Sequence, residues 1–96
     1  MKLYLLVRKD LHPSVQAVQA GHALAEFLLN NDRKTWDNGT LVYLRVKNEN
    51  HLRDWMYKLD ENDVPYSSFV EPDIGDQLTA IATLGKGDIF KRLTLM

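Results

Sequence analysis

The chain contains no cysteine, and this absence excludes disulfide bonds and catalysis by a thiolate. It also lacks any apolar run near the roughly 20 residues that a membrane-spanning helix needs. Its first residues, MKLYLLVRKD, contain an apolar run too short for a secretory signal. We therefore expect a protein of the cytoplasm that does not enter membranes.

A strong excess of positive charge is also missing. The chain has 12 Lys and Arg against 13 Asp and Glu, which gives a net charge of −1. A protein that coats nucleic acid is expected to be clearly basic, so this charge argues against that class. The charges are unevenly spread, because residues 60–76 hold six acids and no Lys or Arg. Nine of the twelve basic residues fall into four groups: Arg8 with Lys9, Arg33 with Lys34, Arg45 with Lys47, and Lys86 with Lys91 and Arg92. The sequence does not place these groups relative to one another.

The length of 96 residues and the apolar content of 45% predict a single domain, residues 1–96, with one modest core. Apolar runs and alternating patterns predict strands over 2–8, 40–47, 66–70 and 77–84. Helical periodicity and capping residues predict helices over 11–31, 49–61 and 89–93. This order favours a mixed sheet with helices on both faces, in which one strand runs against the others because the last two strands are joined by a short loop.

The helix predicted over 11–31 carries both an apolar face and a polar edge. At 100° per residue the apolar face, which we expect to pack on the sheet, comprises Ala17, Val18, Gly21, Leu24, Ala25, Leu28 and Leu29. His22 lies at the border of this face, one helical turn from both Gln19 and Glu26. The polar edge is the first candidate for chemistry, although His22 can equally be a half-buried residue that is bonded to Glu26 or to a backbone carbonyl.

Most enzyme signatures are absent. There is no Walker-type phosphate loop, no GxSxG elbow and no HExxH, and the three histidines lack metal-ligand spacing, so we expect no metal and no cofactor. The second candidate is the acidic turn 71–77, which can also be a solvated connection. Since sites gather at the carboxyl ends of strands, we expect the Asp73 turn and the start of the first helix at the same edge of the sheet.

Taken together, these residues resemble a family. A strand ending in Val7-Arg8-x-Asp10-Leu11 leads to a helix with Ala17-x-Gln19-x-x-His22-Ala23, and later Asp73-x-Gly75 precedes Thr79-Ala80-Ile81-Ala82. Over nearly its whole length the chain is similar to the type-2 peptidyl-tRNA hydrolases. The resemblance implies a three-layer α/β/α fold whose four-stranded mixed sheet has the order 2-1-4-3, with one antiparallel strand. It also implies metal-free hydrolysis of the ester that joins a peptide or an acylated amino acid to tRNA.

The resemblance assigns roles to particular residues. Asp73 would orient a water molecule, Thr79 or a loop N–H would hold the oxyanion, and His22 or Lys9 would stand in for a lysine that the family uses in catalysis. Val15 takes the place of that lysine, and Asp76-Gln77 replace a stretch that contains Arg and Thr in the family. The substrate-binding residues implied are Gln19, Gly75, Gln77, Lys9 and Arg8.

Three hypotheses follow. In the first, the protein is a working hydrolase of peptidyl-tRNA or of a related ester. In the second, it keeps the fold and binds an RNA end, a nucleotide or a protein partner without turnover, because losing a catalytic cation costs about 10²–10⁴ in rate. In the third, it forms a homodimer or larger homo-oligomer through exposed Trp36, Trp55 or Tyr66.

Overall fold

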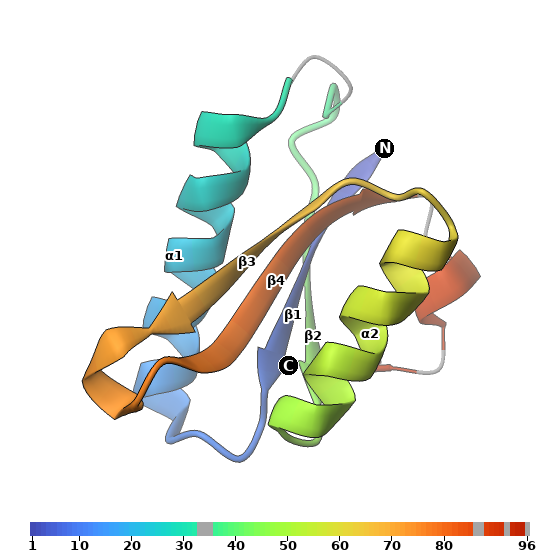
Figure 1. The fold of residues 1–96 in the computed structure, drawn as a ribbon. Coiled ribbons are helices and arrows are strands. Elements are labelled where there is room, and N and C mark those ends of the chain that lie inside the picture. Colours follow the sequence, from blue (N-terminus) through green and yellow to red (C-terminus); the bar gives the residue numbers. More distant parts are fainter. Residues whose placement is uncertain (33–35, 86–87, 92, 96) are drawn as a thin grey trace.

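A single twisted sheet with one long helix on each face forms the molecule (Figure 1). The computed structural model describes residues 1–32, 36–85, 88–91 and 93–95. The main elements are β1 (Lys2–Arg8), α1 (Pro13–Asn30), β2 (Leu41–Val46), α2 (Glu49–Glu61), β3 (Tyr66–Glu71) and β4 (Gln77–Gly85). Every strand and long helix predicted from the sequence is confirmed within two residues at each end.

The sheet has the predicted order. β2 pairs with β1 in parallel, while β4 lies between β1 and β3 and runs antiparallel to both. The four-stranded mixed sheet of order 2-1-4-3 with one antiparallel strand is therefore confirmed, as are the three layers. A short β5 (Thr94–Leu95) pairs antiparallel with β2 and extends the sheet by one strand.

The helix predicted over 89–93 is wrong. In its place the chain makes a single turn of 3-10 helix, η3 (Asp88–Phe90), before it reaches β5. Phe90 is 2% exposed, and its ring lies 4.5 Å from Tyr4 and 5.2 Å from Trp55, centroid to centroid. The burial of this one ring fixes η3 against the core, and the pairing of β5 with β2 fixes Thr94 and Leu95 as extended chain.

The packing face of α1 differs in part from the prediction. Leu24 and Leu28 are partly buried against the sheet as expected, but other members of the predicted face are not. Its buried residues are Gln16, Gln19, Ala20, Ala23 and Phe27. By contrast Val18 is 56% exposed and Leu29 is 81% exposed. The small side chains of Ala20 and Ala23 let the helix approach β1 and β4 closely, in a cluster that includes Ala80 and Ala82. Apolar periodicity missed this face because two glutamines belong to it, each held there by hydrogen bonds.

On the other face, α2 packs as predicted through Leu52, Trp55 and Leu59, against a cluster that includes Leu6 and Ile81. Its first turn is capped by the Asn48 side chain, which accepts a hydrogen bond from the His51 N–H at 3.0 Å. Each half of the core thus sits between one helix and the central strands, and the sheet is covered on both faces.

The aromatic residues proposed for an oligomer interface are buried or only partly exposed. Trp55 is 6% exposed, Trp36 is half-buried and donates its Nε1–H to the Thr40 carbonyl, and the Tyr66 hydroxyl donates to Asp60. The expected exposure is therefore wrong for Trp55, whereas Trp36 and Tyr66 keep part of their surface exposed. The predicted basic residues Arg33, Lys34, Lys86 and Arg92 lie outside the described residues. Within the described ranges, neither long helix is apolar enough over a sufficient length to cross a bilayer.

Candidate active site

The start of α1 and the acidic turn after β3 lie at one edge of the sheet. β1 and β3 both run antiparallel to β4, so their carboxyl ends point the same way. Figure 1 shows the first turn of α1 beside the connection from β3 to β4. The neighbourhood expected from the sequence is therefore present, and residues of both segments line one hollow.

The acidic turn has a defined backbone. One turn of 3-10 helix, η2 (Pro72–Ile74), is followed by Gly75 with φ +74° and Asp76 with φ +57°. Gly75 adopts this left-handed conformation without steric cost, and aspartate tolerates it better than most residues. Two successive left-handed residues turn the chain into β4 and leave Asp73 exposed at the edge of the sheet.

The hollow between the two segments has a volume of about 370 Å³. Its apolar walls are Val15, Val18 and Ile74, and its polar lining comprises Ser14, Gln19, Glu71 and Asp73. No cation is found among these lining residues, because Val15 occupies the place that the resemblance gives to a lysine. The site therefore presents two carboxylates and an amide beside an apolar wall.

Gln19 and Thr79 form a buried pair behind this hollow. Thr79 is fully buried, and its hydroxyl donates to Gln19 Oε1 at 2.7 Å and to the Phe69 carbonyl at 3.3 Å. The hydroxyl that was expected to hold the oxyanion is therefore not among the groups that line the hollow, and its proton is shared between two acceptors inside the fold. No described residue accepts a hydrogen bond from Gln19 Nε2, so the amide N–H groups are the donors left to the hollow.

A β-bulge explains why Thr79 faces α1. The pairing of β3 with β4 passes from Phe69 opposite Ala80 to Val70 opposite Leu78, so Thr79 has no partner on β3. Strict alternation would put Thr79 on the same face as Ile81, which packs in the α2 cluster. The extra residue turns the side chain towards Gln19 instead, which is how bulges redirect side chains near sites.

His22 lies one turn beyond Gln19, outside the hollow. It is exposed, and its ring stacks on Phe69 with 4.4 Å between centroids and 12° between planes. The alternative of a bond to Glu26 is not found among the described residues, since Glu26 Oε2 accepts from Asn30. His22 is thus positioned on the side of α1 that faces β3.

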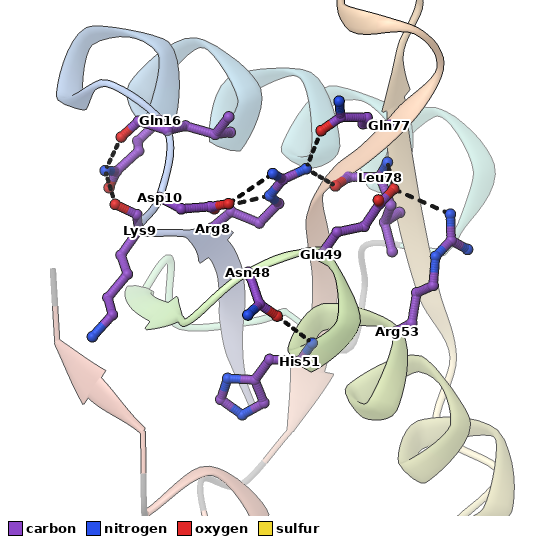
Figure 2. Close-up of polar contacts among 11 residues, drawn as sticks. Arg8, Lys9, Asp10, Gln16, Asn48, Glu49, His51, Arg53, Gln77 and Leu78 are labelled. Atoms are coloured by element: carbon purple, nitrogen blue, oxygen red, sulfur yellow. Dashed lines mark hydrogen bonds and ion pairs between the residues drawn. The ribbon is translucent and has the colours of Figure 1, made fainter.

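The Arg8 side chain is buried and hydrogen-bonded within the fold. It is 7% exposed and makes two hydrogen bonds to the Asp10 carboxylate, from Nε at 3.0 Å and from Nη2 at 2.8 Å (Figure 2). Its Nη1 donates to Gln77 Oε1 at 2.8 Å and to the Leu78 carbonyl at 3.1 Å. The hydrogen bonds from Arg8 lower the pKa of the Asp10 carboxyl. Arg8, which was expected to bind substrate, therefore has four donor bonds committed within the fold, and Gln77 is one of its partners.

Glu49 ties α2 to the same network. Its Oε2 accepts from the Leu78 N–H at 2.8 Å and from Arg53 Nη2 at 3.2 Å (Figure 2). The bond from Leu78 is the main reason that the pKa of Glu49 is lowered. The sequence offers no signal for this contact, because the two residues are 29 positions apart and Glu49 resembles any acidic first-turn residue.

Lys9 is not brought to the hollow. Its carbonyl accepts from Gln16, but its side chain extends away from Gln16 (Figure 2). Of the predicted site residues, the structure therefore gathers Asp73 and Gln19 around the hollow, with Thr79 behind them, Gly75 in the adjacent turn and His22 one turn along. Arg8, Lys9 and Gln77 are placed elsewhere. In the described ranges, no three His, Asp or Glu side chains gather as a metal ion would require.

The comparison with known families agrees with this geometry. A family model described as peptidyl-tRNA hydrolase PTH2 matches residues 1–85, a range that contains β1 to β4 and both long helices. No curated protein matches the chain.

Proposed function

The chain belongs to the peptidyl-tRNA hydrolase PTH2 family, and on that premise we propose that it hydrolyses the ester between tRNA and a peptide or an acylated amino acid. The observation that carries the proposal is the hollow shared by the first turns of α1 and the Asp73 turn. A carboxylate, a set of amide donors and an apolar wall converge there, as ester hydrolysis requires of a site.

In the proposed reaction, water attacks the ester carbonyl carbon while the Asp73 carboxylate accepts a hydrogen bond from that water and takes up its proton. The carbonyl electron pair moves to oxygen. The tetrahedral intermediate then expels the ribose oxygen, which takes the proton from the Asp73 carboxyl group and so restores the Asp73 carboxylate. The products are the peptide carboxylate and tRNA with a free terminal hydroxyl, with one proton released to solvent.

Gln19 is the proposed donor to the developing oxyanion. Its Oε1 is held by the Thr79 hydroxyl, so its Nε2–H groups are oriented before the substrate arrives. A donor fixed in advance costs no reorganisation when charge develops on the carbonyl oxygen, and removing one such donor typically lowers kcat about 10²–10³-fold. Thr79 is then a positioning residue, and His22 remains a candidate to stand in for the missing lysine.

Replacement of Asp73 tests the proposal. The assay follows release of tRNA from N-acetylated aminoacyl-tRNA at excess protein, and Asp73→Asn is expected to lower the rate about 10²–10⁴-fold. Asp76→Asn is the matched control, because it removes the same charge from the same turn but Asp76 does not line the hollow. Equal rates for wild type and Asp73→Asn, or equal losses in the two variants, would remove Asp73 from the reaction.

A second candidate function is favoured by Val15. This side chain is 36% exposed on the wall of the hollow, where the resemblance gives a lysine, and the lining holds two acids with no cation. Such a site can bind an acylated or free RNA end without hydrolysing it. Binding of unacylated tRNA combined with a deacylation rate equal to the uncatalysed rate would establish this function in place of the first.

Two further assignments belong to the same proposal. We place the protein in the cytoplasm, which agrees with a chain that has no cysteine. A homodimer stays a prediction, and sedimentation at micromolar concentration distinguishes it from the 11.1 kDa monomer.

A further inference from the structure

Basic side chains converge at the carboxyl ends of β1 and β2, on the side of the sheet that α2 covers. The Lys9 N–H donates to the Val46 carbonyl at 2.8 Å, so Lys9 and Lys47 leave neighbouring strand ends. The Lys47 N–H in turn donates to His51 Nδ1 at 2.9 Å, which joins the first turn of α2 to the same group. The sequence separates these residues by up to 42 positions, and the fold brings them together.

A hollow of about 380 Å³ opens beside these residues. It is lined by Lys47, His51, Asp54, Trp55, Lys58 and Leu93. Two cations therefore face one acid. Lys58 Nζ lies 4.7 Å from the centroid of the Trp55 ring, and this contact holds its charge at the border of the hollow.

These cations differ from Arg8 in having no anionic partner. Among the described residues, neither Lys47 nor Lys58 takes part in an ion pair, whereas Arg8 is neutralised by Asp10. The positive potential is felt inside the cluster, since the pKa of His51 is lowered by burial and then by the charges of Lys47 and Lys9, against an opposing effect of Asp54. An anion entering the hollow would relieve this repulsion.

His51 also offers a hydrogen-bond donor. Because Nδ1 accepts from the Lys47 N–H, the neutral ring carries its proton on Nε2. Two flexible ammonium groups and one imidazole N–H together suit the tetrahedral oxygens of a phosphate group.

We propose that Lys47, His51 and Lys58, supported by Lys9, bind a phosphate group of an RNA backbone. The site lies at the same edge of the sheet as the Asp73 hollow but on the opposite face, with the network of Arg8 between the two. If the 3′ end of an RNA enters the Asp73 hollow, an upstream phosphate of the same RNA would contact the basic cluster. The choice of RNA as the source of the phosphate rests on the proposed function, whereas the anion site itself does not.

The test measures binding rather than turnover, so that it can fail independently of hydrolysis. The probe is a fluorescently labelled RNA hairpin with an unacylated single-stranded CCA end, titrated with the full chain at several salt concentrations. Lys47→Gln is expected to weaken binding about tenfold at 0.1 M salt and to reduce the slope of log affinity against log salt by about 0.7–0.9. Lys58→Gln is expected to act in the same direction.

Lys2→Gln is the matched control. Lys2 is exposed, carries the same charge and lies at the opposite end of β1, paired with Gly85. If Lys47→Gln and Lys58→Gln bind the RNA with the same affinity as Lys2→Gln, the proposal is overturned. A second titration follows the NMR resonances of His51 as inorganic phosphate is added. If phosphate shifts these resonances but Lys47→Gln leaves the RNA affinity unchanged, the site binds free phosphate and the RNA assignment is contradicted.

Discussion

Thr79 and Gln19 form a buried polar pair of which only Gln19 lines the hollow. Thr79 is fully buried, and Gln19 is 3% exposed. The hydroxyl fixes which end of the amide faces the hollow. Leaving one partner of such a pair unsatisfied costs more than removing both.

Thr79→Val is therefore expected to destabilise the protein by about 1–3 kcal/mol, because it leaves Gln19 Oε1 buried without a donor. Adding Gln19→Met to this variant should recover part of the loss, since both partners are then apolar. Urea unfolding of the wild type, the two single variants and the double variant measures this coupling. Purely additive losses would mean that the two side chains do not depend on each other.

The same pair has a kinetic signature. If Thr79 positions Gln19, Thr79→Val lowers kcat for deacylation, and Thr79→Ser, which keeps the hydroxyl, restores it. A purely structural role would leave kcat unchanged in the fraction of protein that remains folded.

Some residues of the candidate site could be predicted from the sequence. Asp73 was predicted because its turn follows the carboxyl end of a strand, and Gln19 because it lies on the polar edge of the first helix and in the motif that carries the family resemblance. The burial of Thr79 was not predicted, because the bulge opposite Phe69 and Val70 breaks the alternation of side chains on which a strand prediction relies. Nor was the burial of Arg8, whose partners Gln77 and Leu78 are about 70 positions away.

The elements illustrate a second limit of sequence patterns. α2 was predicted correctly because its apolar residues recur at helical spacing and Asn48 caps it. The face of α1 was predicted only in part. Leu24 and Leu28 pack on the sheet as expected, but the packing also depends on Ala20 and Ala23 and on two glutamines that are satisfied internally. Apolar periodicity cannot recognise a packing face that includes hydrogen-bonded polar residues.

The contact between α2 and β4 predicts a dependence of stability on pH. The pKa of Glu49 lies below its ordinary value of 4.5 in the folded chain, chiefly through the bond from the Leu78 N–H. Its stabilising effect is therefore complete above about pH 5 and is lost as the pH falls through the lowered pKa. Glu49→Gln should cost about 1 kcal/mol at pH 7 and progressively less as the pH falls below 4.

Thermal unfolding of wild type and Glu49→Gln between pH 3 and pH 7 measures this difference. Glu61→Gln, at the exposed far end of α2, is the control. A Glu49 difference that stays constant over this range would show that the contact with Leu78 does not depend on the carboxylate charge.

At the scale of the whole molecule, a mixed sheet with helices on both faces followed from the alternation of elements and the short loop before β4, whereas the strand order followed from the family resemblance. What the sequence could not show is how charges distribute over the finished surface. Arg8 is neutralised within the fold, whereas Lys9, Lys47 and Lys58 gather on one side of the same edge. The Asp73 hollow and this basic cluster therefore divide the edge into an acidic and a basic side.

The central claim is that the first turns of α1 and the Asp73 turn enclose one reaction site from which a cation is missing. Returning that cation is the most direct test, and Val18→Lys controls for added charge because Val18 also lines the hollow. Deacylation of N-acetylated aminoacyl-tRNA under single-turnover conditions should be about 10²-fold or more faster for Val15→Lys than for wild type, and little changed for Val18→Lys. A Val15→Lys rate no higher than that of wild type, or an equal gain in both variants, would contradict the claim.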